Sequence, residues 1–326
     1  MTLEITLFVL GFVFLVKGAD VLVDGASSIG KRFGLSTFFI GLTIVAFGTS
    51  LPELIVSTLA SINGSAGLAM GNIIGSNISN TLLILGVSAI IAPLIVKKAT
   101  VNKEIPFSLL AVLALVFLVN DMLLDGNGSN GLTRIDGLVL LLFFVIFLYY
   151  TFGISKEKET LLEKAVDDIK DKTDEYKIGV ASGMIVVGLA GLYLGGRWIV
   201  SGAISMATYF GVSEALIGLT IVAIGTSLPE LAASAVAAYK GRTDIAIGNI
   251  VGSNVFNILW VLGLTAIISP IGFEFYLNID FIILIFITIL VMILVYVGKK
   301  NILDKREGII LIVIYIAYLV YLVIRG

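Results

Sequence analysis

Two glutamates, Glu53 and Glu230, lie inside apolar sequence, each within the hexapeptide GTSLPE. Each belongs to a duplicated stretch, with copies 177 residues apart: GLTIVAFGTSLPEL at 41–54 and GLTIVAIGTSLPEL at 218–231, then GNIIGSNISN at 71–80 and GNIVGSNVFN at 248–257. Ionisable side chains are costly to bury in apolar segments, so two of them at equivalent positions indicate a functional site.

A proline precedes each glutamate and predicts a break in the helix that carries it. Pro52 cannot donate a hydrogen bond to the Gly48 carbonyl, and its ring crowds that carbonyl. Pro229 and Gly225 repeat this arrangement in the second copy. The breaks should free neutral carbonyl oxygens beside each carboxylate, namely those of Ala46, Gly48 or Thr49 and those of Ala223, Gly225 or Thr226.

Polar residues near each glutamate recur every four positions, which places them on one face of a helix. Thr49 shares a face with Glu53, and Ser50 flanks that face. The segment after each glutamate carries a similar polar row: Asn72, Ser76 and Asn80 in the first copy, and Asn249, Ser253 and Asn257 in the second. Such rows can serve only to join helices, but their duplication around two glutamates favours a ligand set.

The chemistry that this set predicts is the binding of a hard cation. Glu53 and Glu230, brought together across a pseudo-twofold axis, would place two like charges in a poorly hydrated site, and a cation removes that cost. Carboxylates with carbonyl, hydroxyl and amide oxygens suit Ca2+, which takes six to eight oxygens, better than Mg2+, which requires tight octahedral geometry. Na+ could use subsets of the same oxygens.

The composition identifies an integral membrane protein and excludes several other classes. The chain has 326 residues, of which 58% are hydrophobic and 13% charged, against roughly 45 to 50% apolar residues in soluble domains. It has no cysteine and no histidine, so any metal must be held by oxygen, and no cofactor is indicated. No basic stripe suggests nucleic acid.

Ten apolar runs long enough to cross a bilayer predict an all-α fold. They lie near 3–28, 36–62, 66–93, 104–122, 134–154, 178–206, 213–238, 243–270, 278–298 and 307–325. We therefore divide the chain into a five-helix repeat at 1–154, a linker loop at 155–177 and a second five-helix repeat at 178–326. Because each repeat has an odd number of spans, the second is threaded upside down, which is typical of secondary transporters. A duplicated scaffold without transport is the alternative.

Lysine and arginine predict the orientation in the cell membrane, because short cytoplasmic loops are enriched in them. They gather on one face, at Lys31, Arg32, Lys97, Lys98, Lys103, Lys240, Arg242, Lys299, Lys300, Lys305, Arg306 and in the 155–177 loop. That face should be cytoplasmic, and both termini extracytoplasmic. Lys17, Asp20, Asp24 and Arg197 lie within spans; we expect structural roles for them, by snorkelling or by pairing between repeats.

The paired GTSLPE motifs, each followed by GNIxGSNxxN, closely resemble the two alpha-repeats of the cation/calcium antiporter superfamily, in its prokaryotic sodium/calcium exchanger branch. The resemblance covers nearly the whole chain. It implies that Glu53 and Glu230, with backbone oxygens of Thr49 and Thr226, hold Ca2+ and share in binding Na+. It further implies Na+ sites at Ala46, Ser50, Ser76, Asn80, Ala223, Ser227, Ser253 and Asn257, and an exchange of three Na+ for one Ca2+.

Three features of the sequence bear on that resemblance. Some prokaryotic members carry aspartate at the position of Asn257, so the amide makes this site less acidic. The 155–177 loop is much shorter than the loop of animal exchangers and lacks room for their regulatory domains. Proton/calcium members typically show GNxxE where this chain has GTSLPE, which favours Na+ over H+ as the coupling ion.

The sequence therefore predicts an antiporter that uses inward Na+ flow to expel Ca2+ by alternating access, with the bilayer as its environment and no protein partner evident. The alternatives are a proton- or potassium-coupled exchanger on the same fold and a passive cation channel. An enzyme is disfavoured, because no constellation of nucleophile, base and orienting group is visible.

Overall fold

The computed structural model describes residues 2–97, 100–122, 126, 130–155, 176–209, 223–297 and 301–325. Almost all of the predicted linker loop, and the first part of the span predicted at 213–238, lie outside the described residues. Eight of the described helices are long and apolar enough to cross a membrane, and a ninth span is bent by 41° between residues 49 and 51.

The first repeat contains α1 (Thr2–Phe33), α2 (Thr37–Ile40), η1 (Gly41–Val45), α3 (Ala46–Thr49), α4 (Leu51–Ile62), α5 (Ala66–Ser79), η2 (Asn80–Ile84), α6 (Leu85–Ile91), β1 (Leu94–Ile95), η3 (Thr100–Glu104), α7 (Ile105–Val119), β2 (Gly131–Leu132) and α9 (Arg134–Ser155). The second contains α11 (Ile178–Tyr209), α13 (Ala223–Thr226), α14 (Leu228–Tyr239), α15 (Thr243–Val255), η5 (Phe256–Val261), α16 (Leu262–Ile268), β3 (Ile271–Gly272), η6 (Phe275–Leu277), α17 (Asn278–Val297), β4 (Ile302–Leu303) and α18 (Lys305–Arg325).

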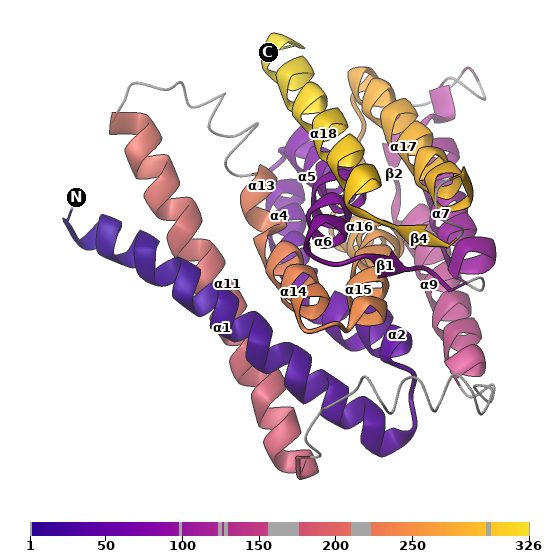
Figure 1. The fold of residues 1–326 in the computed structure, drawn as a ribbon. Coiled ribbons are helices and arrows are strands. Elements are labelled where there is room, and N and C mark those ends of the chain that lie inside the picture. Colours follow the sequence, from indigo (N-terminus) through magenta and orange to yellow (C-terminus); the bar gives the residue numbers. More distant parts are fainter. Residues whose placement is uncertain are drawn as a thin grey trace.

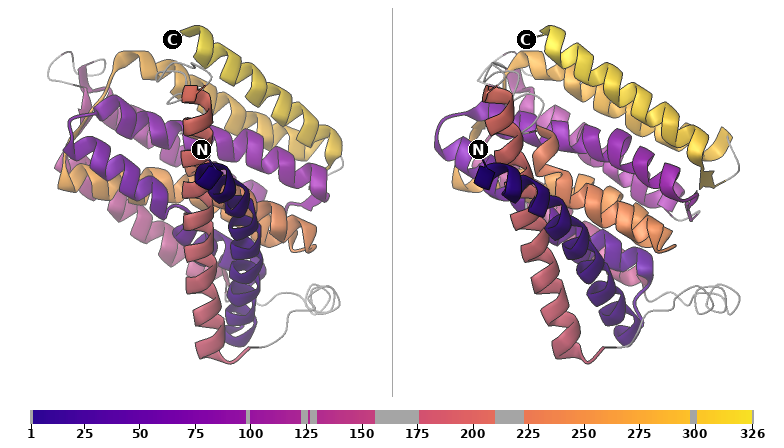
Figure 2. Two further views of the ribbon diagram at one scale, coloured as in Figure 1. Left: turned by 90° about the vertical axis from the view of Figure 1, so that its left-hand side faces the viewer. Right: turned by 60° about the vertical axis from the view of Figure 1, so that its left-hand side comes forward.

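The two long helices α1 and α11 lie side by side along one flank of the molecule and extend beyond the other helices at one end (Figures 1 and 2). Glycines let their backbones approach closely. A Cβ atom built on Gly18 would lie 2.8 Å from the Gly188 carbonyl oxygen, and one built on Gly195 would lie 2.7 Å from the Gly11 carbonyl oxygen. Any larger residue at these four positions would push the pair apart.

The remaining helices interlock between repeats. In each repeat the last helix packs on the third span of the other repeat, α9 on α16 and α18 on α6. Two short antiparallel strand pairs do the same, because β1 pairs with β4 and β2 pairs with β3. Neither half of the chain therefore folds around a core of its own; the core lies where the repeats meet.

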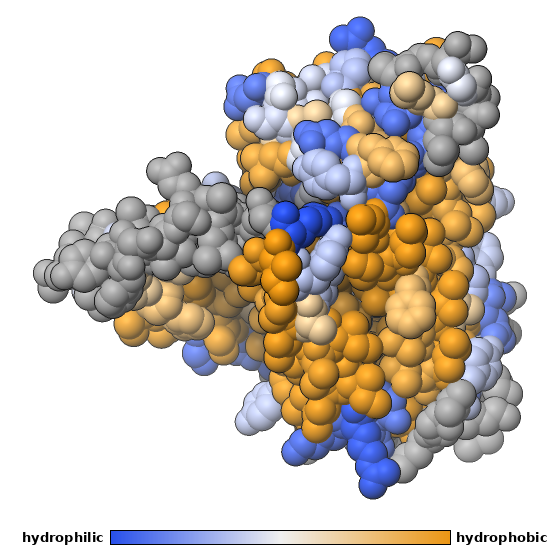
Figure 3. Space-filling model, turned by 90° about the horizontal axis from the view of Figure 1, so that it is seen from above, coloured by the Kyte–Doolittle hydropathy of each residue, from blue (hydrophilic) through white to orange (hydrophobic). Residues whose placement is uncertain are grey.

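The outer surface is apolar, as a lipid-facing surface requires. Figure 3 shows hydrophobic side chains over the middle of one face, with hydrophilic residues gathered toward its upper and lower edges. Leu142 on α9, Ile282 on α17 and Val313 on α18 are each more than half exposed. Buried polar residues instead gather inside, on the segments around the two helix breaks.

Two acidic residues of the first span, Asp20 and Asp24, pair with the second repeat, which was one of the two expected arrangements. Lys240, which follows α14, lies 2.6 Å from Asp20 and 2.8 Å from Asp24 on α1, and Arg242 lies 2.7 Å from Asp24. These contacts fasten α1 to the turn between α14 and α15. We call this group of four residues the ion-pair cluster.

Candidate cation site

Both helix breaks occur where the prolines predict them. α3 ends at Thr49 and α4 begins at Leu51, and the residue between them, Ser50, has φ −83° and ψ 3°. Ser227 has φ −87° and ψ 4° in the second repeat. Each break therefore consists of one non-helical residue, which lies three positions before a glutamate.

The glutamates Glu53 and Glu230 are both completely buried. The hydroxyl groups that reach them both come from the first repeat. Ser50 donates to Glu230 Oε1 over 3.5 Å, and Ser76 donates to Glu53 Oε1 over 3.4 Å. Ser227 in turn donates to the Ser76 hydroxyl over 3.3 Å. Ser50 of the first repeat thus contacts the glutamate of the second directly, and Ser227 of the second repeat reaches the glutamate of the first through Ser76.

A second pair of contacts crosses between the repeats at the threonines. The Thr49 hydroxyl donates to Asn249 Oδ1 and the Thr226 hydroxyl to Asn72 Oδ1, both over 3.2 Å. Each asparagine also donates a hydrogen bond within its own repeat, Asn249 to Ser234 over 2.9 Å and Asn72 to Ser57 over 3.0 Å. Asn72 and Asn249 therefore hold the helix breaks in place.

Several buried polar atoms of the predicted ligands have no hydrogen-bond partner among the residues that the structure describes. They are Glu53 Oε2, Glu230 Oε2, Asn257 Oδ1 and both polar atoms of Asn80. Buried polar atoms are normally paired, so these unpaired acceptors, which include one oxygen of each carboxylate, are suited to a cation. No group of three or more acidic residues occurs in the described segments, so further ligands would be neutral oxygens.

The polar rows on α5 and α15 run directly into π-helical segments. η2 begins at Asn80, and η5, which begins at Phe256, contains Asn257. π-helical turns inside α-helices often occur at functional sites. The four-residue spacing in the sequence did not predict them, because a π turn depends on packing around the helix and leaves no mark in the residue types.

The structure describes three further predicted site residues, Ser253, Ala46 and Ala223, in different detail. Ser253 is buried, and its hydroxyl lies 3.5 Å from that of Thr49. Of the three carbonyls expected as alternatives in the first copy, that of Ala46 accepts a hydrogen bond from the Ser50 N–H over 3.0 Å, which leaves it a second lone pair for an ion. For Ala223 only the backbone is described, as the first residue of α13.

A cavity of about 300 Å3 lies next to the breaks. It lies between α11 and α4, and its lining includes Gly48, Pro52, Ile55, Tyr193 and Pro229. On the equivalent side of the other repeat α1 packs directly along α14. The two long helices are therefore placed differently, with α1 in contact with α14 and a cavity between α11 and α4, although the repeats share their motifs.

This geometry can be compared with known proteins. The family model described as "Sodium/calcium exchanger protein" matches residues 3–153 and 180–324, which together make up most of the chain. The chain belongs to this family. The two matched segments correspond to the two repeats, and both contain the GTSLPE motif.

Relatives of this exchanger family member match it over nearly its full length. The putative antiporter CaxA of Alkalimonas amylolytica is 40% identical over 319 residues, which cover 96% of this chain and 97% of that protein. The sodium/calcium exchanger MaX1 of Methanosarcina acetivorans is 32% identical over 346 residues, covering 98% and 99%.

A solved structure of the sodium-calcium exchanger NCX_Mj, soaked with Na+ and Ca2+, superimposes on this chain with a TM-score of 0.80. It is 32% identical, and the match covers 97% of each chain. The predicted architecture of ten helices in two inverted repeats is thereby confirmed.

Proposed function

We propose that this multi-pass membrane protein exchanges Na+ for Ca2+, and that Glu53 and Glu230 hold the transported ions between the two repeats. The observation that carries the proposal is the complete burial of one carboxylate from each repeat in a membrane-spanning core, where hydroxyl contacts through Ser50, Ser76 and Ser227 connect the two helix breaks with both glutamates. Two buried like charges are stable together only when a cation neutralises them or a proton is taken up. The family relationship supports Na+ and Ca2+ as the ions.

The ligands follow from the residues at the breaks and from the family resemblance. Ca2+ would take both glutamates with backbone oxygens of Thr49 and Thr226. Na+ ions would share the glutamates and add oxygens from Ala46, Ser50, Ser76, Asn80, Ala223, Ser227, Ser253 and Asn257. Because the two ions draw on the same carboxylates, they cannot bind fully at once, and this competition couples their transport.

Alternating access would use the two long helices. In the described arrangement α1 lies against α14, fastened by the ion-pair cluster, while a cavity separates α11 from α4. Since the repeats are inverted, the opposite arrangement would place α11 on α4 and withdraw α1 from α14. Moving α1 and α11 together would expose the site first on one side and then on the other.

The orientation follows from the lysines and arginines. The turn that carries Lys240 and Arg242 would face the cytoplasm, with the 155–177 loop, and the termini would lie outside. The described arrangement is then open toward the outside. Exchange of more than two Na+ for each Ca2+ would move net charge, so calcium extrusion would be electrogenic.

Transport by the protein in sealed liposomes tests this function. We expect Ca2+ uptake that requires Na+ inside, saturates with Ca2+ and is abolished by Glu53→Gln or Glu230→Gln. Glu104→Gln is the matched control, because Glu104 is also buried, at 3% exposure, but lies on η3 outside the site. Uptake that persists without Na+ and follows a pH gradient would contradict sodium coupling, and flux that needs no counter-ion would indicate a channel.

A further inference from the structure

Asn77 lies at the centre of a buried amide network between α5 and α15. It is fully buried, and it is not one of the predicted ligands of the cation site. Its Nδ2 donates to the main-chain carbonyl of Asn254 over 3.2 Å, and its Oδ1 accepts from Asn257 Nδ2 over 3.0 Å. One side chain thus connects the backbone of α15 with a candidate ligand one turn further along.

The first of these bonds fixes the direction of the second. A main-chain carbonyl can only accept, so Asn77 must present its NH2 group to Asn254 and its oxygen to Asn257. That oxygen can also only accept, so Asn257 must in turn present its NH2 group to Asn77. The Asn257 carbonyl oxygen is left at the other end of the amide, buried and without a partner in the described residues.

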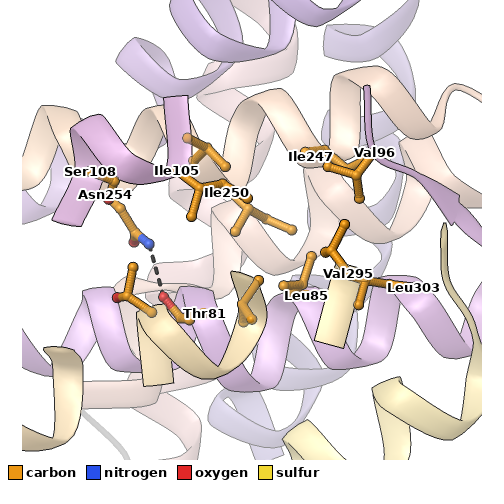
Figure 4. Close-up of a pocket in the computed structure, with 13 residues that line it drawn as sticks. Thr81, Leu85, Val96, Ile105, Ser108, Ile247, Ile250, Asn254, Val295 and Leu303 are labelled. Atoms are coloured by element: carbon orange, nitrogen blue, oxygen red, sulfur yellow. Dashed lines mark hydrogen bonds between the residues drawn. The ribbon is translucent and has the colours of Figure 1, made fainter. Parts of the chain in front are cut away.

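Asn80, the counterpart of Asn257 in the first repeat, is not oriented in this way by a second amide. Asn254 is the counterpart of Asn77, but its Nδ2 donates to the Thr81 hydroxyl over 2.9 Å, as the dashed line in Figure 4 shows. Thr81 also donates to the Asn77 carbonyl over 2.8 Å, and the second repeat has Ile258 at the position of Thr81. Asn80, the counterpart of Asn257, makes no hydrogen bond to any described residue through either polar atom.

We propose that Asn77 is a positioning residue that makes Asn257 present its amide oxygen, and not its NH2 group, to the transported cations. This inference rests on the proposed function of the same site. An amide whose NH2 end faced the site would repel a cation, whereas its oxygen is a neutral ligand for Na+ or Ca2+. Asn80 can rotate to suit the bound ion, and Asn257 cannot.

A cycle of single and double substitutions tests the inference by Na+ and Ca2+ binding to the purified full-length protein in detergent. If Asn77 acts through Asn257, then Asn77→Ala lowers Na+ affinity by about the same factor as Asn257→Ala. The double variant then binds no more weakly than Asn257→Ala alone. Independent sites give additive effects to within about twofold, so losses that multiply in the double variant would overturn the inference.

The pseudo-equivalent pair provides a matched control. Asn254→Ala and Asn80→Ala change the counterparts of Asn77 and Asn257, which have no bond between their amides, so their effects should multiply. A purely structural role for Asn77 predicts the same behaviour in both cycles, and that result would contradict the inference. If Asn77→Ala does not fold, Asn77→Ser replaces it, because the shorter side chain withdraws the acceptor from Asn257.

Binding and transport separate this inference from the proposed function. Wild-type protein that fails to exchange Na+ for Ca2+ in liposomes would contradict the function. The binding cycle can still show coupling between Asn77 and Asn257 in that case. Additive binding losses in a protein that does exchange the two ions would contradict the role of Asn77 alone.

Discussion

At the scale of single residues, the site joins two half-sites by hydrogen bonds that cross from one repeat to the other. Glu53 and Glu230 each accept a hydrogen bond from a serine hydroxyl at the Oε1 oxygen, and the Oε2 oxygen of each has no partner within the described structure. Since removing a partner from a buried polar group costs more than the bond itself contributes, the surrounding asparagines and serines should matter as much as the ligands that they hold.

The asparagine that anchors a helix break provides a prediction at this scale. Asn249→Ala removes the acceptor of the Thr49 hydroxyl and the donor to Ser234. We expect the free energy of unfolding to fall by about 1–3 kcal/mol, together with a loss of Ca2+ affinity, because Thr49 is no longer held. Thermal unfolding and calorimetric titration measure the two effects. Ser234→Ala removes only the outer bond and should leave Ca2+ affinity closer to wild type; equal affinities in all three proteins would refute this role.

The residue types of the site could be predicted from sequence, but their pairing could not. The proline breaks, the burial of Glu53 and Glu230 and the meeting of the repeats follow from duplicated motifs in apolar sequence. The amide network of Asn77 does not, because it joins side chains about 180 residues apart whose hydrogen bonds depend on how α5 and α15 pack. Nor could the sequence show that the Ala46 carbonyl keeps its helical partner, the Ser50 N–H four residues later.

At the scale of helices, the contact between α1 and α11 depends on glycine. A Cβ atom on Gly188 would lie 2.7 Å from the Leu22 nitrogen, whereas one on Gly196, further along α11, would meet no atom within 4 Å. We predict that Gly188→Ala destabilises the protein by about 1–3 kcal/mol through overpacking. Gly196→Ala should be neutral or stabilising, since alanine favours helix. Thermal unfolding of both variants decides this, and similar melting temperatures would contradict it.

The ion-pair cluster provides a second prediction at this scale. Asp24→Asn weakens the contacts of α1 with Lys240 and Arg242 and should favour the arrangement in which α11 closes on α4. Because the chain has no cysteine, a single Ile55→Cys substitution reports on the cavity, which Ile55 lines. Partly exposed ion pairs typically contribute less than about 1 kcal/mol, so labelling by a water-soluble thiol reagent should slow by up to about fivefold. Faster or unchanged labelling would show that the cluster does not hold this arrangement.

At the scale of the whole molecule, inverted threading explains why identical motifs have different surroundings. The repeats share their sequence signature, yet α1 is closed on α14 and α11 stands away from α4. Composition and span counting predicted the fold class, and charge counting predicted an orientation. Which side is closed could not be predicted. It depends on whether α1 packs on α14 or α11 packs on α4, and the two repeats carry the same motifs for both contacts.

The orientation is itself a prediction for the intact cell. In single-cysteine variants, Asn63→Cys should react with an impermeant thiol reagent added outside, and Lys305→Cys should react only after the membrane is opened. Both positions are exposed in the structure, so access and not burial determines the result. The reverse pattern would place the lysine-rich face outside and invert the direction assigned to the cavity.

The central claim is that Glu53 and Glu230 share one Ca2+ ion. Calorimetric titration of the purified protein with Ca2+, compared with Glu53→Gln, Glu230→Gln and the double variant, tests it most directly. We predict one Ca2+ bound per chain, and loss of that binding in either single variant to the same extent as in the double variant. Wild-type Ca2+ affinity in either single variant would contradict the shared site.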